Sequence, residues 1–394
     1  MGKRYIFFWI QTLIVIYLIG CVDSNAGKIS TETQQANFAT EKPSLTPGTI
    51  STQSPEYTPA YSSLPQISEE NVENFGFLGV FDGGVNSLAI SPNGNYLAAT
   101  YNNEIGILWD ISEVSNWNDI ENAPREVFLS RGELSFSSNS KFLGTGGTVL
   151  EVPSMLTLQE IPGSWDLRRI EFSPHGNTFT LVDWSSMSFW DYDGSQWALE
   201  YKQDSPCVFN VEYSPDGSLI GESLYWCGGE DLNGEGVNIW SVSDHELLFS
   251  FPPPEHSHAA HFNLDPYAYV VFSPNNQFAA TGTKDQPYVQ IWSLETGELV
   301  ADVNTTLDTE KGYFVPDVEC VYFSQDSKVV AIAGHNAIMF KRIGDGKLIN
   351  IEYINDNQST YVTSCAASTD GKLIFIGDNS GEVSLWGIDT SDRK

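Results

Sequence analysis

Three histidines close together offer the most obvious metal-binding chemistry in the chain. His256, His258 and His261 lie within six residues, although the whole chain has only six histidines. Imidazole nitrogens are common ligands of zinc and other transition metals. The run 252–266 that holds them has no regular period that would fix the three rings on one face of a helix or strand. Two interpretations stay open, a weak metal site and an exposed polar loop, and the spacing favours the loop.

An acidic stretch just upstream follows part of the pattern of a calcium-binding loop. In Asp231-Leu-Asn-Gly-Glu-Gly236, oxygen-bearing side chains alternate and glycine stands sixth, as in loops that wrap Ca²⁺. Such loops also need a bidentate acid at the twelfth position, where this chain has Val242. Calcium binding is therefore a minor alternative. We expect no cofactor, with a bound metal ion as the one weak exception.

The cysteines are too few for a fold that depends on disulfides. They are Cys21, Cys207, Cys227, Cys320 and Cys365. Cys207 and Cys227 flank one predicted hairpin, whose register would bring the two thiols within bridging distance. A disulfide between Cys207 and Cys227 is therefore one of two interpretations, the other being two free thiols. Cys320 and Cys365 fall inside predicted strands, and we expect both to be free and buried.

No local motif assembles a catalytic site. Serine, histidine and aspartate are all present, but the chain has no nucleophile elbow, no phosphate-binding loop and no second catalytic domain. We therefore expect no catalytic residues and a protein that is not an enzyme. A hydrolase remains the alternative to a binding protein.

A recurring turn identifies the elements that must position these residues. The unit is an apolar strand, a turn that begins with serine, and a second apolar strand, best seen at 270–282 and followed by Trp292. Proline, asparagine and glycine give the turn its chemistry. The seven turns begin at Ser91, Ser137, Ser173, Ser214, Ser273, Ser324 and Ser368. They recur about every 46 residues, which is the period of a propeller blade. Seven copies predict seven blades.

These motifs make the chain similar to the WD-repeat (beta-transducin repeat) family over about residues 75 to 388. The shared pattern is Phe-Ser-Pro-Asp-Gly, an apolar strand that ends in small residues, then Ile-Trp-Asp or Leu-Trp-Asp. The resemblance implies an all-β, seven-bladed propeller that binds proteins. Among the tryptophans of this motif, only Trp109 and Trp190 are followed by Asp, and the Gly-His pair that opens a repeat is missing. We therefore expect the family's buried His–Ser–Asp–Trp network to be absent.

Each repeat predicts four antiparallel strands, a to d in chain order. In blade 3 they are 168–172, 178–182, 186–191 and 196–201. The tryptophans at the ends of the c strands should pack between blades.

The two ends of the repeat region complement each other. The last repeat ends just past Trp386 without a fourth strand, whereas the strand-like segment 75–81 precedes the first repeat. We predict that 75–81 is the outer strand of the final blade. This arrangement would close the ring and remove exposed sheet edges.

Three long connections interrupt the repeats at 224–236, 252–266 and 305–317. The first is a b–c loop and the others are d-to-a connections, which leave a propeller on the same face. All three therefore gather above blades 4 to 6, and insertions of this kind often form the binding face. We predict a recognition surface there, the other interpretation being loop variation without a partner. Its aromatic anchors would be Tyr225, Trp226, Tyr313 and Phe314. The long connection 112–124 should lie on the opposite face.

The beginning of the chain predicts an export signal. A short basic head precedes the apolar run 5–20, which only Gln11 interrupts and which is short for a bilayer span. The run ends in Leu18-Ile-Gly-Cys21, which resembles the bacterial lipoprotein signal box. The resemblance implies cleavage before Cys21 and attachment of lipid, such as palmitate, at this residue. An ordinary secretory signal and an uncleaved anchor are the alternatives.

The sequence thus divides into three parts. Residues 1–20 are the signal peptide, 21–70 the lipidated cysteine with a Ser/Thr/Pro-rich tether, and 71–394 the propeller. The tether has too few apolar residues to offset its ordering entropy, so we expect it to be disordered.

The charge of the chain bears on its partners. The formal net charge of −32 repels phosphate backbones, so we expect no nucleic-acid binding, and it favours cations and basic partners. We expect a monomeric propeller, lipid-anchored to a bacterial membrane outside the cytoplasm, that binds protein or peptide through the loops above blades 4 to 6. The alternative is a hydrolase or metal-dependent ligand-binding protein that uses the same face. That alternative needs convergent polar groups at the channel mouth, whereas the scaffold needs an exposed aromatic patch.

Overall fold

The serine of each a–b turn organises the hairpin around it. In six of the seven turns its hydroxyl donates to the Asn or Asp two residues later, as from Ser273 to Asn275 at 2.7 Å. The same oxygen accepts the N–H five residues on, as from Phe278 at 2.9 Å. The fourth turn residue has a left-handed φ in every blade, for example 71° at Gly94 and 55° at Asn276, which favours glycine and asparagine there.

The computed structural model describes residues 63–82, 86–101, 105–114, 117–130, 132–161, 169–176, 178–183, 185–205, 208–224, 236–252, 268–283, 288–305, 307–309, 312–314, 318–335, 337–354 and 360–388. All of them lie in the compact unit formed by residues 54–394.

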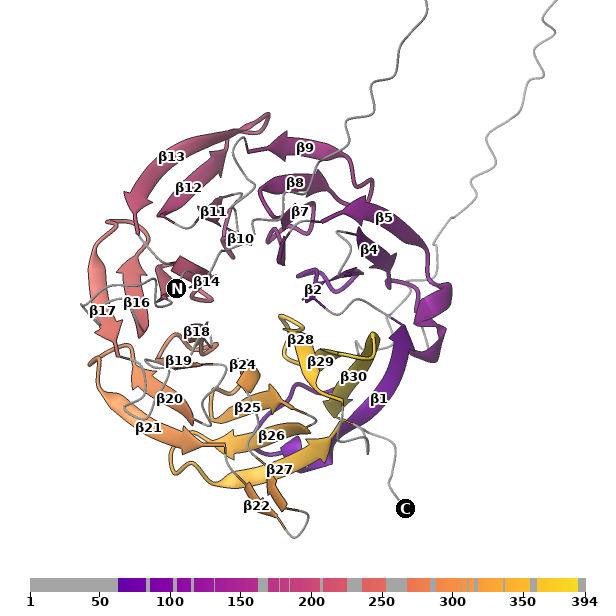
Figure 1. Cartoon of the computed structure of the whole chain (residues 1–394), viewed down its shortest axis with the longest axis vertical. Helices are drawn as coiled ribbons and strands as arrows, with labels where there is room; N and C mark the ends of the chain where they lie inside the picture. Colours follow the sequence, from indigo (N-terminus) through magenta and orange to yellow (C-terminus); the bar gives the residue numbers. More distant parts are fainter. Residues whose placement is uncertain are drawn as a thin grey trace, which may run out of the picture. The chain divides into compact units, whose positions relative to one another are not determined.

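Seven four-stranded antiparallel sheets form the described fold (Figure 1), as predicted. Blade 1 is β2(Ser87–Ile90), β3(Tyr96–Thr100), β4(Ile105–Asp110) and β5(Arg125–Leu129). Blade 2 is β6(Leu134–Phe136), β7(Phe142–Thr145), β8(Thr148–Glu151) and β9(Thr157–Glu160). Blade 3 is β10(Arg169–Phe172), β11(Phe179–Val182), β12(Ser186–Tyr192) and β13(Trp197–Asp204). Blade 4 is β14(Val208–Tyr213), β15(Leu219–Leu224), β16(Gly236–Ser241) and β17(Leu247–Phe251). Blade 5 is β18(Ala268–Phe272), β19(Phe278–Thr283), β20(Tyr288–Ser293) and β21(Leu299–Asn304).

The remaining elements complete the ring. Blade 6 is β24(Val318–Phe323), β25(Val329–Gly334), β26(Ala337–Arg342) and β27(Leu348–Tyr353), and blade 7 is β28(Val362–Ala367), β29(Leu373–Asp378), β30(Glu382–Ile388) and β1(Phe75–Asp82). Between them lie the short hairpin β22(Leu307–Thr309) and β23(Gly312–Phe314), and the 3-10 turns η1(Val72–Asn74) and η2(Trp117–Asn122).

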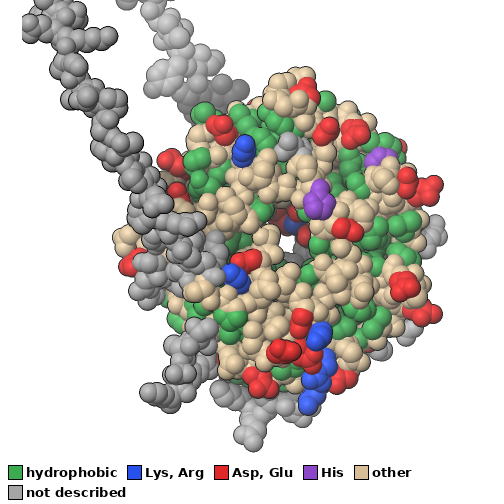
Figure 2. All heavy atoms as spheres, turned by 180° about the vertical axis from the view of Figure 1, so that it is seen from behind, with side chains coloured by type: hydrophobic (Ala, Val, Ile, Leu, Met, Phe, Trp, Pro, Cys, Tyr) green, Lys and Arg blue, Asp and Glu red, His purple; other side chains and the backbone are tan. Residues whose placement is uncertain are grey.

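The N-terminal strand closes the ring as predicted. β1 pairs antiparallel with β30, from Phe75 opposite Ile388 to Asp82 opposite Glu382. Each innermost a strand contacts the a strand of the next blade, and β28 of blade 7 contacts β2 of blade 1. Figure 2 shows the side of the ring opposite to Figure 1, with an opening at its centre.

The c-strand tryptophans pack between blades, which confirms that prediction. Trp386 of blade 7, for example, lies with Ile338 and Phe340 of blade 6. The other four pack on their preceding blades: Trp109, Trp190, Trp240 and Trp292. The indole N–H groups of four of these residues donate to Ser188, Glu222, Thr281 and Ser384.

Because the strands of a blade alternate in direction, its connections divide between two faces. We call the side with the a–b and c–d turns the turn face, and the side with the b–c loops and d–a connections the mouth face. The c–d connection of blade 1, which contains η2, lies on the turn face. The three long connections of blades 4 to 6 leave on the mouth face, as predicted.

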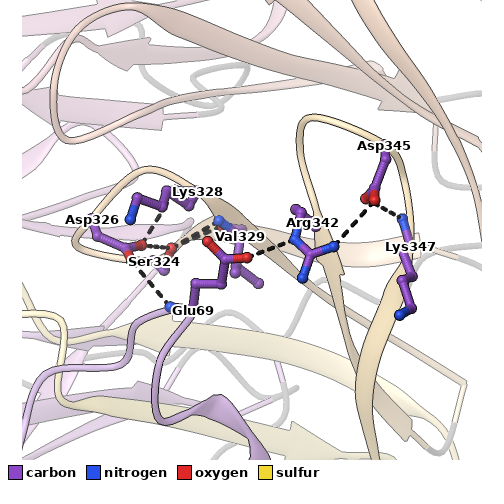
Figure 3. Close-up of polar contacts among 8 residues, drawn as sticks. All are labelled: Glu69, Ser324, Asp326, Lys328, Val329, Arg342, Asp345 and Lys347. Carbon is purple, nitrogen blue, oxygen red and sulfur yellow. Dashed lines mark hydrogen bonds and ion pairs between the residues drawn. The ribbon is translucent and has the colours of Figure 1, made fainter.

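Residues 63–74, the N-terminal strap, run across the turn face of blades 6 and 7 before β1 begins. The Ile67 N–H donates to the Gly371 carbonyl at 2.8 Å and joins the strap to the a–b turn of blade 7. At blade 6, the Glu69 N–H donates to Asp326 at 3.1 Å, and its carboxylate accepts Arg342 Nε at 2.6 Å. Figure 3 shows Glu69 between Asp326 and Arg342, both of blade 6. The strap thus bridges blade 6 and the closing blade 7.

Candidate binding site at the channel mouth

A cavity of about 210 Å³ lies at the start of the innermost strands. The residue four positions before each turn serine lines it, so all seven blades contribute. These residues are Ser87, Glu133, Arg169, Asn210, Tyr269, Cys320 and Ser364. Each a strand begins where a d–a connection ends, so the cavity lies at the mouth face.

Arg169, at the start of β10, gathers three carboxylates from three blades. Its guanidinium lies 2.5 Å from Glu133 Oε2 of blade 2, 3.1 Å from Glu171 Oε2 of its own strand and 3.8 Å from Glu212 Oε2 of blade 4. The arginine side chain is only 16% exposed, whereas that of Glu133 is 44% exposed. One buried cation therefore holds several acids, and part of that acidic surface reaches solvent.

The surroundings alter the proton affinity of these acids. Burial, followed by the negative charge of Glu171, raises the pKa of Glu212 to about 8, against the opposing effect of Arg169. Burial also raises the pKa of Glu171, and this effect exceeds the opposing effect of the Arg169 charge. Burial and the charge of Glu212 raise the pKa of Tyr322 above the ordinary range of tyrosine. The cluster therefore favours the protonated form of Glu212 more than an exposed position would.

Three polar atoms of the lining lack a hydrogen-bond partner within the described part of the chain. They are Asn210 Oδ1, Tyr269 OH and Ser364 Oγ. Ser364 is only 8% exposed. Buried polar atoms in proteins nearly always have a partner. All three atoms are themselves buried, so they are not exposed to the cavity.

A disulfide joins Cys320 and Cys365, so the expectation that both are free was wrong. Cys320 lies in β24 and Cys365 in β28, the innermost strands of adjacent blades, with Cα atoms 6.2 Å apart. Both cysteines line the cavity. Their separation of 45 residues is about one repeat, which places them side by side in the ring. That spacing was the signal from which the bridge could have been predicted.

The sites predicted from sequence fall almost entirely outside the described residues. This holds for Cys21, Cys207, Tyr225, Trp226, Cys227, His256, His258 and His261. The calcium-like stretch 231–235 lies outside them as well. Tyr313 and Phe314 belong to β23, in the d–a connection between blades 5 and 6, but their side chains are not described. All of these assignments stay predictions.

The chemistry of the described site favours binding. Convergent polar groups stand at the channel mouth, as the enzyme alternative requires, but Arg169 contacts three of the carboxylates. Within the described ranges, no group of three or more His, Cys, Asp or Glu side chains is placed to hold a metal ion. No described helix is long and apolar enough to cross a membrane.

Comparison with known proteins agrees with the fold. The family model "WD domain, G-beta repeat" matches residues 76–110 and 350–387. The small ribosomal subunit protein RACK1 of Medicago sativa is 26% identical over 181 residues, which are 46% of this chain and 39% of that protein. RACK1 of Glycine max is 24% identical, with the same coverage.

A third relative is the periodic tryptophan protein 2 homolog of Dictyostelium discoideum. It is 22% identical over 285 residues, which are 58% of this chain and 29% of that protein. The chain thus spans about two fifths or less of the length of these relatives. With the seven four-stranded blades, the matches support a WD-repeat propeller.

Proposed function

We propose that this WD-repeat propeller is an interaction scaffold that receives a protein or peptide at its mouth face. WD-repeat propellers typically serve as protein-interaction scaffolds. The observation that carries the proposal is the cavity at the channel mouth, which lies on the face where the three long connections leave blades 4 to 6. A partner held by those connections would also cover the mouth of the cavity.

We further infer that the protein is monomeric and is exported and held at a bacterial membrane by lipid on Cys21. The basic head, the apolar run and the box that ends at Cys21 support this location. The disulfide between Cys320 and Cys365 supports it independently, because disulfides persist mainly in oxidising compartments outside the cytoplasm. Substitution Cys21→Ala should release the protein from the membrane fraction. Unchanged membrane association would contradict lipidation at this residue.

A hydrolase that uses the same face is the second candidate. The raised pKa of Glu212 favours it, because general acid–base catalysis works best with a pKa near the operating pH. The pairing of Arg169 with these acids argues for binding instead. Turnover of ester, peptide or glycoside substrates that disappears with Glu212→Gln would favour the hydrolase.

Crosslinking in intact cells tests the scaffold. The anchored protein is compared with a variant in which the connections 224–236, 252–266 and 305–317 are shortened to the length found in the other blades. A variant shortened at 112–124, on the turn face, is the matched control. We expect a protein partner that the mouth-face variant loses and the control keeps. Partners that both variants retain, or no partner at all, would overturn the proposed surface.

A further inference from the structure

We propose that the N-terminal strap is a releasable clasp on the joint between blades 6 and 7, and that the Cys320–Cys365 bridge decides whether its release stays local or opens the ring. Three features of the described residues support this inference. They are the contact that the strap makes between the two blades, the loose packing beside it, and the position of the bridge.

At most joints of the ring, the a–b turns of neighbouring blades bond to each other directly. Such bonds join blades 1 and 2, 2 and 3, 4 and 5, 5 and 6, and 7 and 1. Between blades 6 and 7, a strap residue stands between the turns. The Gln325 N–H of the blade 6 turn donates to the Ile67 carbonyl at 3.2 Å, and the Ile67 N–H donates to the Gly371 carbonyl of the blade 7 turn at 2.8 Å. A segment from outside the repeats therefore supplies the connection at this joint.

The surroundings of Ile67 are not close-packed. A cavity of about 130 Å³ borders this residue at the turn face of blades 5 to 7. Pro274, Tyr322, Phe340 and Leu373 form part of its wall. A void removes contacts that a close-packed neighbour would supply, and segments with few such contacts are the ones that open locally. The strap should therefore detach more readily than the strands beneath it.

One apolar cluster spans the joint and contains both the strap and the closing strand. Ile67 and Val72 of the strap and Phe75 of β1 lie in it with Phe340 of blade 6 and Trp386 of blade 7. The burial of Phe75 therefore depends on the two blades staying together. Release of the strap removes one of the parts that hold them.

The bridge holds the same joint independently of the strap. Cys320 and Cys365 connect the innermost strands β24 and β28, whereas the strap connects the turns in which these strands end. With the bridge in place, blades 6 and 7 stay adjacent after the strap detaches, so Phe75 keeps its partners. Without the bridge, detachment of the strap should loosen the joint and release β1 as well.

The order of the chain gives this clasp a use. The strap precedes β1, so a pull on the chain ahead of residue 63 reaches the strap before it reaches the closing strand. The proposed anchor at Cys21 would exert such a pull. This use rests on the proposed lipidation, whereas the clasp itself rests on the contacts of the strap.

Amide hydrogen exchange of the mature full-length protein tests local release. The N–H groups of Ile67 and Gln325 report on the strap, because each donates in one of its bonds. The amides of β1 report on the closing strand, and those of β12 in blade 3 report on global unfolding. With the bridge formed, we expect the two strap amides to exchange at least about tenfold faster than those of β1, since the strap opens alone. Equal rates would overturn the proposal, because strap and closing strand would then open as one unit.

Removal of the bridge tests its role. In Cys320→Ser with Cys365→Ser, the amides of β1 should exchange within about threefold of the strap amides, since both segments now open together. General destabilisation would accelerate exchange in β1 and β12 by the same factor. The proposal requires β1 to accelerate at least about tenfold more than β12. Equal acceleration of the two strands would overturn the role of the bridge.

Ile67→Ala tests the clasp with the cysteines unchanged, so it decides the question even where the double-serine variant does not fold. In the bridged protein it should accelerate exchange of the Gln325 amide at least about tenfold and leave β1 and β12 unchanged. The matched control is Ser138→Ala, which removes an exposed bond between the turns of blades 2 and 3 and should leave the Gln325 amide unchanged. Acceleration of β1 to the same degree as Gln325 would overturn the proposal.

None of these exchange rates depends on a bound partner. Failure of the clasp and failure of the proposed scaffold are therefore seen in separate measurements.

Discussion

Cys320 and Cys365 covalently join the innermost strands of blades 6 and 7, and blade 7 is the blade in which the ring closes. The N-terminal strap crosses the turn face of the same two blades through Ile67 and Glu69. β1 completes the outer edge of blade 7 by pairing with β30. The bridge, the strap and the strand pairing therefore secure one sector of the ring at its inner edge, its face and its rim.

Replacing both cysteines should weaken the fold measurably. Cys320→Ser with Cys365→Ser frees a segment of 45 residues in the unfolded chain, so the free energy of unfolding should fall by about 2–4 kcal/mol. Urea denaturation without reductant measures the change. Dithiothreitol should then destabilise the wild type more than the double variant. Equal effects of the reductant on both proteins would show that this bridge does not contribute.

The closing strand should depend on one buried ring. Phe75 is fully buried, with its ring centroid 4.5 Å from that of Phe340 and 6.1 Å from that of Trp386. Phe75→Ala should cost about 3–5 kcal/mol of unfolding free energy, because it leaves a cavity between blades 6 and 7. Phe77 is 51% exposed in the same strand, so Phe77→Ala should cost about 1 kcal/mol. Thermal and urea unfolding of both variants check the contrast, which similar losses would contradict.

The strap should be held by its apolar residue more than by its ion pair. Ile67 is 5% exposed, and Ile67→Ala should cost about 2–4 kcal/mol of unfolding free energy. The Glu69–Arg342 pair is partly exposed, so Glu69→Gln should change stability by less than about 1 kcal/mol. Limited proteolysis near residue 67 should be faster only in the Ile67 variant. Faster cleavage in the Glu69 variant instead would assign the main role to the ion pair.

Glu212 should make stability fall as pH rises. Its folded pKa of about 8 lies above the ordinary glutamate value of 4.5, so the folded state keeps a proton that the unfolded state releases between these values. The contribution of Glu212 to unfolding free energy is thus fully present below about pH 4.5 and is lost as pH rises through 8. Glu133, Arg169, Glu171 and Tyr322 are the titratable groups that face it.

Glu212→Gln tests this dependence. The stability of wild type relative to this variant should decline between about pH 4.5 and pH 8 and be level on either side. Urea denaturation across this range provides the curves. Glu160→Gln, on the exposed outer strand of blade 2, should follow the wild type throughout. A constant difference between the wild-type and Glu212→Gln curves would mean that Glu212 ionises normally in the folded protein.

The blades could be predicted because the features that define them are local. The bond from Ser273 to Asn275, and the N–H that Phe278 donates to Ser273, span at most five residues. Turn serines therefore mark the hairpins in the sequence itself. Ring closure by β1 also followed, because the last repeat visibly lacked a strand.

The site was missed because its residues meet only in the ring. Glu133 and Arg169 are 36 residues apart and belong to different blades, so neither forms a local motif with the other. Both residues stand four residues before a turn serine. That shared position becomes meaningful once the innermost strands are known to line a channel. The same reasoning recovers Cys320, whereas its partner Cys365 stands three residues before its serine and needs the pairing of neighbouring strands.

The pairing of β1 with β30 also sets an order of events during synthesis. Phe75 is made more than three hundred residues before Ile388, its partner in the sheet. Because a nascent chain emerges from its N-terminal end, the first strand produced is the last to find its place. Until then, an apolar strand has no partner, and the ring has an open gap at blade 7. A chain that lacks its final residues would therefore lose the closure made by its first strand as well.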